Sequence, residues 1–269
     1  MSISAAGNIQ SFLSLLQMTD SALPIGSYSH SWGLETFVQN GTIQNAEDAT
    51  RAINNLLRFA VAPRDGTAAA LAYRFEKSPN RVGNRNSLAT INSYLSASMW
   101  TEETHSASVD LGRRLLRLAE SLGWYDTSEH NAVNPMKPGN GNRNANGTGT
   151  GNGGENNGVT ESKGANEIEH ACHHSVAVGF LGAKLGIDIN DLIPAYLFAS
   201  TTALVAALVK LVPLGHTDGQ RIIAQSQAII AELSPSCICA TLGDLGGFAP
   251  LSEWASHAHQ SLYSRLFQS

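Results

Sequence analysis

The sequence predicts an all-α protein, and three observations support this prediction. Apolar residues recur at helical spacing along most of the chain, and residues that begin or end helices stand between the periodic segments. The alternating, β-branched runs that signal strands do not recur, and no internal repeat is apparent. At 269 residues the chain is long enough to bury a sizeable core. We therefore expect a single helical-bundle domain over residues 1–269.

Two short helices are expected near the N-terminus. Phe12, Leu15 and Leu16 stand at i, i+3 and i+4, which is the stripe of a short amphipathic helix. A second helix is expected over residues 31–39, and Gly41 suits the left-handed conformation that closes helices.

A third helix is expected to begin at Asn45, whose side chain can cap it. Glu47 and Asp48 fall in its first turn, where the helix dipole favours negative charge. This helix should stop before Pro63, because the residue preceding a proline disfavours helical geometry. Another helix should then cover residues 64–77.

Helical patterning continues through the rest of the chain. Residues 87–122 form a long helical stretch with an expected break near Ser98. Further helices are expected over residues 167–185, ending at Gly186, and over residues 217–233.

Residues 192–209 carry no charge and are long enough to cross a membrane. The run includes Pro194, Tyr196 and the Ser-Thr-Thr cluster at residues 200–202, and the sequence suggests no second spanning segment. A helix that is apolar all round can equally be the central helix of a soluble domain. We therefore expect a core helix here and no membrane association.

A Gly/Asn-rich segment divides the helical regions. From Pro138 to Gly158, fifteen of twenty-one residues are Gly or Asn, so this segment has almost nothing to bury against the entropy of ordering it. Helical patterning of similar character resumes on both sides. We therefore expect a disordered insertion loop over residues 135–166 rather than a linker between two domains.

Composition and charge exclude some classes of partner. The net charge of −5 shows no basic footprint, which argues against nucleic acid or an anionic membrane as a partner. Only 14% of residues are charged, so we expect apolar surface that partners or a second copy cover. Cys172, Cys237 and Cys239 suggest no disulfide framework, and the N-terminus lacks a signal-peptide pattern. We expect a cytoplasmic protein.

The segment around Cys172 offers candidate metal ligands. His170 and His174 would lie at i and i+4 on one helical face, a spacing that can hold a transition metal. Cys237 and Cys239 would complete a site only if the fold brings them near. Because no further ligand is indicated, a helix start with a buried cysteine and partly exposed histidines is the favoured interpretation. We expect no bound metal or cofactor.

The sequence contains no catalytic constellation. Asp65, Glu102 and Glu103 are conceivable acid–base groups, but carboxylates at helix ends are more often solvated or capping. No nucleophile or phosphate-binding loop accompanies them. His257 and His259 stand at i and i+2, so they do not face one another on a helix. We expect no enzymatic activity.

Several blocks of the sequence resemble the UreF family of urease accessory proteins. SALPIGSYSHSWGLE, at residues 21–35, is similar to the family's LPIG-x-[FY]-S-x-S-x-GLE stretch. The tail resembles the family's HE-x-QYSRLF-x-S ending, and PLGHTDGQ, at residues 213–220, resembles its PLGQ-x-x-GQ block, with His216 in place of Gln. EETHSASVDLGRRLL and HHSVAVGFLGAKLGI resemble two family helices, with His105 in place of Arg and Ser175 in place of Pro. The blocks keep the family's order over most of the chain.

That resemblance implies an all-α homodimer without enzymatic activity that acts in urease maturation. UreF-like proteins bind a UreD/UreH-type scaffold, and together they recruit the GTPase UreG to the urease apoprotein, so that nickel enters its active site. The complex, and not a cofactor of this chain, would handle the nickel. Two alternatives stay open: a nickel-binding metallochaperone that uses His170, Cys172 and His174, and a GTPase-activating protein for UreG in which Arg265 supplies the finger.

Composition and resemblance together select the expected partner-binding residues. Tyr, Arg and Phe are enriched at interfaces and cluster in the tail at residues 260–269, which we expect to be flexible and to order on partner binding. The segments 24–35 and 213–220 should form adjoining surface. For Glu35 a structural hydrogen bond is favoured over lining a path for metal. The full set is Pro24, Ile25, Gly26, Tyr28, Ser29, Glu35, Pro213, Gly215, Gln220, Tyr263, Arg265 and Phe267.

Overall fold

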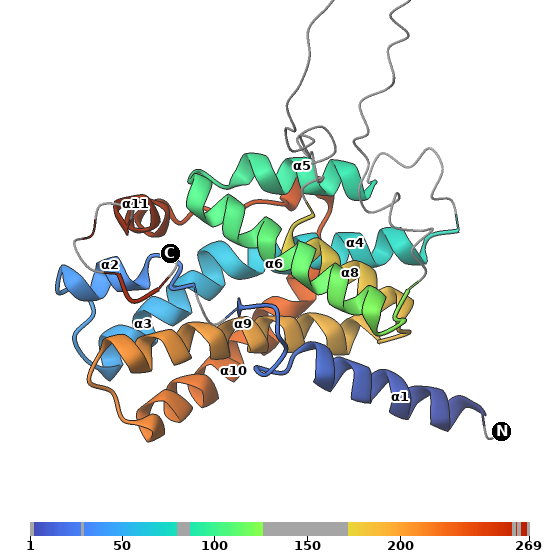
Figure 1. Ribbon diagram of the computed structural model, residues 1–269, viewed down its shortest axis with the longest axis horizontal. Coiled ribbons are helices and arrows are strands. Elements are labelled where there is room, and N and C mark those ends of the chain that lie inside the picture. Colours follow the sequence, from blue (N-terminus) through green and yellow to red (C-terminus); the bar gives the residue numbers. More distant parts are fainter. Residues whose placement is uncertain are drawn as a thin grey trace, which may run out of the picture.

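The computed structural model describes residues 3–27, 30–79, 87–125, 172–259, 262 and 265–267 (Figure 1). This part of the chain is helical and contains no β-strand, which confirms the predicted fold class. The expected insertion at residues 135–166 lies outside the described residues, as do Tyr28, Ser29, His170 and Tyr263. The elements are α1 (Ile3–Met18), α2 (Leu34–Gln39), α3 (Ala46–Leu56), η2 (Leu57–Gly66), α4 (Thr67–Lys77), α5 (Leu88–Ser98), α6 (Glu102–Ser121), α8 (His174–Lys184), α9 (Ile189–Leu211), α10 (His216–Cys239), η4 (Leu242–Asp244) and α11 (Pro250–His259).

The most completely buried helix is α8, which packs against α4 and α6 (Figure 1). Every residue from Ser175 to Ala183 is buried. The backbones of α8 and α4 meet directly at Gly179, where an added Cβ would lie 2.1 Å from the carbonyl oxygen of Ala69. The residues of the core belong to one continuous apolar cluster, to which nearly every helix contributes.

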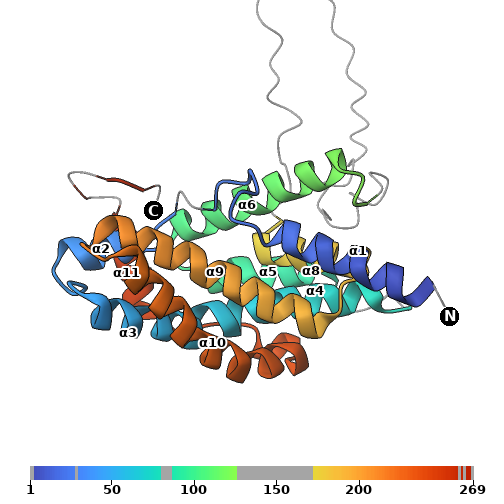
Figure 2. The same cartoon turned by 90° about the horizontal axis from the view of Figure 1, so that it is seen from below.

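The uncharged run at residues 192–209 forms most of α9, which lies beside α10 (Figures 1 and 2). Both helices have the length and apolarity of a membrane span, whereas the sequence suggested only one. Half of the apolar window of α9 is buried inside the protein. This burial is typical of a core helix in a soluble protein, although α8, and not α9, is the helix enclosed on all sides.

The helical path continues through Pro63, contrary to the prediction. Asn45 caps α3 as expected, because its side chain accepts hydrogen bonds from the backbone N–H groups of Glu47 and Asp48. The chain then continues as the π-helix η2, which contains Pro63, and leads directly into α4. A π-helix bonds each N–H to a carbonyl five residues back, and its wider turn accommodates a proline better than an α-helix does.

The helix predicted over residues 31–39 begins only at Leu34. The turn before it holds Trp32 and Gly33 in left-handed backbone, with φ of 52° and 81°. At Gly33 an added Cβ would lie 2.9 Å from the backbone nitrogen of Ser256, so glycine permits the close contact with α11. Gly41 has φ of 77° after α2, as predicted.

Other boundaries differ in detail from the sequence predictions. The break near Ser98 is confirmed, since α5 ends there and α6 begins at Glu102. α10 extends to Cys239, past its predicted end at residue 233. α8 begins at His174, not at residue 167, so Cys172 precedes the helix.

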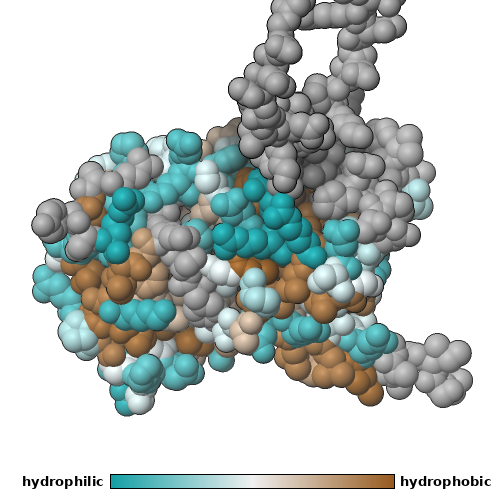
Figure 3. Space-filling view, viewed as in Figure 1, coloured by the Kyte–Doolittle hydropathy of each residue, from teal (hydrophilic) through white to brown (hydrophobic). Residues whose placement is uncertain are grey.

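The N-terminal helix α1 presents a different face from the predicted one. Leu15 is buried, but Phe12 and Leu16 are 56% and 50% exposed. The exposed stripe consists of Ile9, Phe12, Leu13 and Leu16 at i, i+3, i+4 and i+7. The helix extends away from the rest of the bundle (Figure 1), and apolar side chains gather over it in Figure 3.

Candidate functional site

The C-terminal tail is docked onto the carboxylate of Glu35, at the start of α2 (Figure 1). Glu35 is only 2% exposed. Its Oε1 accepts the backbone N–H of Leu266 at 2.8 Å, and its Oε2 accepts that of Phe267 at 3.2 Å. These are the structural hydrogen bonds that the sequence favoured for Glu35. We call Glu35, Glu103, Lys210 and His259, which surround the tail anchor, the tail cradle.

His259 connects two carboxylates in the tail cradle. Its Nε2 lies 2.9 Å from Oε2 of Glu35, and its Nδ1 lies 3.2 Å from Oε1 of Glu103. The ring is fully buried. Because these three residues belong to α11, α2 and α6, the contacts join the last helix to two distant segments of the chain. A buried polar network of this kind rigidifies what it connects.

Further polar contacts hold α11 against the same two helices. Thr36 donates a 2.7 Å hydrogen bond from its hydroxyl to the carbonyl oxygen of Ala255. The hydroxyl oxygens of Thr104 and Ser256 lie 3.1 Å apart. The position of α11 therefore rests largely on buried hydrogen bonds.

The described part of the tail separates a buried anchor from exposed side chains. Phe267 is buried, and Nζ of Lys210 lies 5.6 Å from the centre of its ring. Arg265 and Leu266 are exposed. A partner could therefore contact Arg265 without displacing Phe267.

The other predicted partner-binding residues fall into two groups. Pro24, Pro213, Gly215 and Gln220 are exposed. Ile25 is buried, and its carbonyl oxygen accepts a 3.3 Å hydrogen bond from Arg114; Gly26 beside it is half-buried with φ of 85°. The loop from α9 to α10, which contains Pro213 and Gly215, lies at the same end of the molecule as α2 (Figures 1 and 2).

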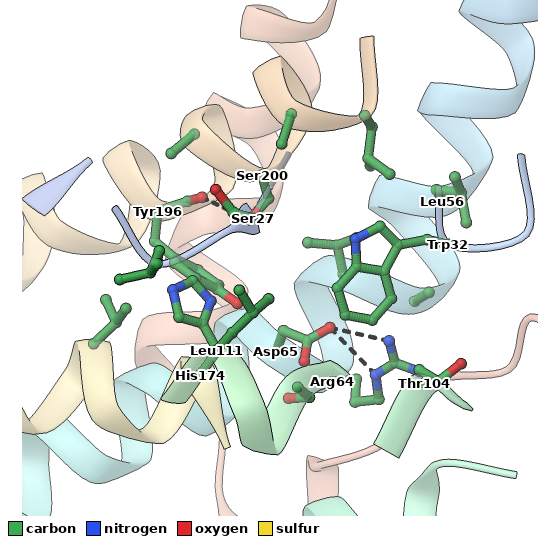
Figure 4. Close-up of a pocket in the computed structure, with 18 of the residues that line it drawn as sticks. Ser27, Trp32, Leu56, Arg64, Asp65, Thr104, Leu111, His174, Tyr196 and Ser200 are labelled. Atoms are coloured by element: carbon green, nitrogen blue, oxygen red, sulfur yellow. Dashed lines mark hydrogen bonds and ion pairs between the residues drawn. The ribbon is translucent and has the colours of Figure 1, made fainter. Parts of the chain in front are cut away.

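A cavity of about 120 Å³ lies next to the tail cradle. Thr104 and Ser256 line it, and these residues stand beside Glu103 on α6 and one turn before His259 on α11. Figure 4 shows Trp32 on one side of this space, His174 and Tyr196 on the opposite side and Asp65 below them. These side chains come from the turn before α2, from α8, from α9 and from η2, so only the tertiary fold brings them together.

Arg64 is buried between two carboxylates at this cavity. Its guanidinium lies 3.2 Å from Oδ2 of Asp65 and 2.9 Å from Oε1 of Glu253. Burial raises the pKa of the Asp65 carboxyl, against the opposing effect of the neighbouring guanidinium. The sequence interpretation of Asp65 as a solvated or capping group is therefore wrong, because η2 turns it inward.

The aromatic and imidazole groups of the cavity are neutral at physiological pH. Burial lowers the pKa of His174 to about 4 and raises the pKa of Tyr196 well above its usual value. The two rings lie 5.7 Å apart. His174 thus lines the cavity from the first position of α8 and is partly exposed, as the favoured sequence interpretation expected.

The candidate metal ligands do not form a cluster in the described part of the chain. Burial raises the pKa of the Cys172 thiol to about 12, whereas metal binding needs the thiolate. Cys237 is buried too, and its sulfur contacts the carbonyl oxygen of Ala62 at 3.2 Å. No group of three or more His, Cys, Asp or Glu side chains with metal-binding geometry occurs among the residues described. His170 lies outside the described residues, and Cys172 and His173 precede α8, which starts at His174.

Sequence reasoning did not identify Glu103 and His259 as site residues, nor Arg64 and Glu253. Each pairs with a residue far away in the chain, so no local spacing indicates the contact. The sequence offered one weak signal. Only 14% of its residues are charged, and a charged residue that is buried is usually paired, so each one was a candidate for a buried pair.

The fold and the tail cradle define an all-helical protein in which a buried carboxylate holds the C-terminal tail. The UreF family model matches residues 43–227. The chain is also similar to proteins named urease accessory protein UreF. The protein from Bacillus sp. (strain TB-90) is 30% identical over 96% of this chain and 98% of its own length. The proteins from Nostoc sp. (strain PCC 7120 / SAG 25.82 / UTEX 2576) and Azoarcus sp. (strain BH72) are each 28% identical, over 96% and 100% of both chains, respectively. The chain belongs to the UreF family of urease accessory proteins.

Proposed function

We propose that this protein is a non-enzymatic adaptor in urease maturation. Together with a UreD/UreH-type scaffold it recruits the GTPase UreG to the urease apoprotein, where nickel is inserted. Membership of the UreF family supports a role in urease maturation. The relatives' shared name, urease accessory protein, supports a role that assists urease and is not itself catalytic. We place this role in the cytoplasm.

The docked tail is the observation that carries this proposal. Glu35 fixes the backbone at Leu266 and Phe267, so the neighbouring Arg265 projects from a defined position instead of a frayed end. An exposed guanidinium on a fixed backbone can meet a carboxylate of a partner bidentately. A fixed anchor also lowers the entropy that binding must overcome.

Replacing Arg265 with alanine should abolish recruitment of the partners. Because the side chain is exposed, the variant should keep its fold, while its affinity for the scaffold–UreG assembly should fall at least tenfold, about 1.4 kcal/mol. The measurement is co-purification of the tagged full chain with a UreD/UreH-type scaffold and UreG, followed by size-exclusion chromatography.

Arg221→Ala is the matched control, since Arg221 is also an exposed arginine and, among the described residues, pairs with Asp218 on its own helix. It should leave the complex intact. A complex that survives Arg265→Ala, or one that is lost equally in both variants, would contradict the assignment of Arg265.

We also propose a homodimer in which the exposed stripe of α1 is covered by a second copy. The stripe holds Ile9, Phe12, Leu13 and Leu16, and α1 contains no charged residue between Ile3 and Met18. An uncharged apolar stripe is self-complementary, as a two-fold interface requires.

Leu13→Glu should convert the dimer to a monomer without unfolding it. Leu13 is more than half exposed, so the charge costs little in the monomer, but pairing would bury it. Sedimentation or light scattering gives the mass, and circular dichroism checks helicity. Gln10→Glu, which places the same charge on an already exposed polar position of α1, is the control. A Leu13→Glu protein that keeps the wild-type mass would refute α1 as the interface.

A further inference from the structure

The cavity beside η2 carries more negative than positive charge. The titratable groups that line it are Asp20, Arg64, Asp65, His174, Tyr196 and Glu253. Of the three charged groups that are almost fully buried, Arg64 supplies one positive charge, while Asp65 and Glu253 supply two negative ones. An unbalanced negative charge in a buried site costs free energy. Binding of an additional cation, or of a proton, to this side of the cavity is therefore favoured.

The Glu253 carboxylate also has an unused acceptor atom. Both contacts of the Arg64 guanidinium with Asp65 are made to Oδ2. Oε2 of Glu253 is buried and has no hydrogen-bond partner among the described residues. Acceptors left without donors in a buried site call for N–H or O–H groups from a ligand.

The remaining walls are aromatic. Trp32 lies across the space from Tyr196 and His174 (Figure 4). The indole is carried by left-handed backbone, with φ of 52°, which is an uncommon conformation for a bulky residue and is typical of functional sites. Aromatic faces around a carboxylate are the recurring way in which proteins bind organic cations.

A metal ion fits this cavity less well than an organic cation does. Transition metals take three or more His, Cys, Asp or Glu ligands, and no such group occurs within the described residues. The volume of about 120 Å³ is about tenfold what one water molecule needs, so a ligand of several heavy atoms has room.

We propose that this cavity binds a small organic cation with N–H donors, of the guanidinium or alkylammonium class. Its charge pairs with Asp65, its N–H groups donate to Oε2 of Glu253, and its flat or alkyl part lies between Trp32 and Tyr196. A free metabolite and the side chain of an arginine or lysine on another polypeptide present the same group.

Methylguanidinium and N-methylurea test this proposal, because they have nearly the same shape and differ in charge. We expect methylguanidinium to shift the indole N–H resonance of Trp32 in the NMR spectrum of the full chain, and to saturate. The resonance is identified by its loss in Trp32→Phe. N-methylurea should bind at least tenfold more weakly. Equal shifts with both probes, or no saturable shift with methylguanidinium up to about 10 mM, would overturn the proposal.

Asp65→Asn should weaken methylguanidinium binding at least tenfold, since it keeps the shape of the side chain and removes the charge. Asp218→Asn, at an exposed acid on α10, should bind as the unaltered protein does. Unchanged binding in Asp65→Asn would refute the role of that carboxylate. If this variant does not fold, the comparison of the two probes on the unaltered chain still decides the outcome.

A blocked Gly-Arg-Gly tripeptide distinguishes the two sources of the cation. A free small molecule is the source if the tripeptide fails to displace methylguanidinium, because a chain on both sides of the arginine does not fit into about 120 Å³. Displacement at similar concentrations assigns the cavity to the side chain of a polypeptide.

Discussion

Gly179→Ala is expected to destabilise the protein by about 3 kcal/mol or more, at the upper end of the effects of overpacking. The added Cβ would lie 2.1 Å from the carbonyl oxygen of Ala69 and 2.9 Å from its carbonyl carbon. Both atoms belong to the backbone of α4, so no side-chain rotation relieves the clash, and α8 must move away from α4. Urea unfolding followed by circular dichroism measures the loss.

Gly215→Ala is the control for this substitution. Gly215 is exposed before α10 with φ of −69°, and an added Cβ would meet only the Asp218 carboxylate, at 3.4 Å. Its stability should change by less than about 0.5 kcal/mol, as is typical of surface substitutions. If both variants unfold at the same urea concentration as the unaltered chain, α4 and α8 are not in backbone contact.

Glu35→Ala should release the tail and destabilise the protein by about 3 kcal/mol, because it leaves the buried hydrogen-bonding partners of this carboxylate unsatisfied. The substitution removes the acceptor for the backbone N–H groups of Leu266 and Phe267 and for His259. Hydrogen exchange at residues 265–267 should become as fast as in an unstructured peptide. Recruitment of the scaffold and UreG should also weaken, since Arg265 loses its fixed position.

A control variant makes this second prediction specific. Glu232→Ala removes an exposed carboxylate that pairs with Arg58 at the surface, and such pairs contribute little to stability. Its tail should exchange as slowly as that of the unaltered chain. Slow exchange at Leu266 and Phe267 in Glu35→Ala would show that the carboxylate does not hold the tail.

Local sequence patterns predicted those features of the fold that depend on neighbouring residues. Asn45 caps α3 because its side chain reaches N–H groups two and three residues ahead, and Gly41 closes α2 because its conformation is a property of one residue. The break between α5 and α6 after Ser98 was also predicted from neighbouring residues. The passage through Pro63 was mispredicted, because the tendency of proline to end a helix is only a local preference, and η2 is held in the interior by α9 and α10.

The site was much less predictable than the helices. Glu35 and the tail were selected from the sequence, and the structure joins Glu35 to residues that stand 231 and 232 positions later in the chain. Nothing in the spacing of the sequence indicates that His259 and Glu103 share that contact. Local patterns also did not predict which face of a helix is buried. The apolar residues of α1 were recognised in the sequence, but the exposure of Phe12 and Leu16 was not predicted.

The sequence by itself determined the all-α class, most helix positions, the family and the segments worth examining, because helical periodicity, caps and ordered motif blocks are written in consecutive residues. Only the tertiary structure decided that α8 is the enclosed helix, that Asp65 and Arg64 are buried together, and that the tail rests on Glu35. Those outcomes depend on which distant side chains share a low-dielectric interior, where an unpaired charge is costly and a satisfied one holds distant segments together.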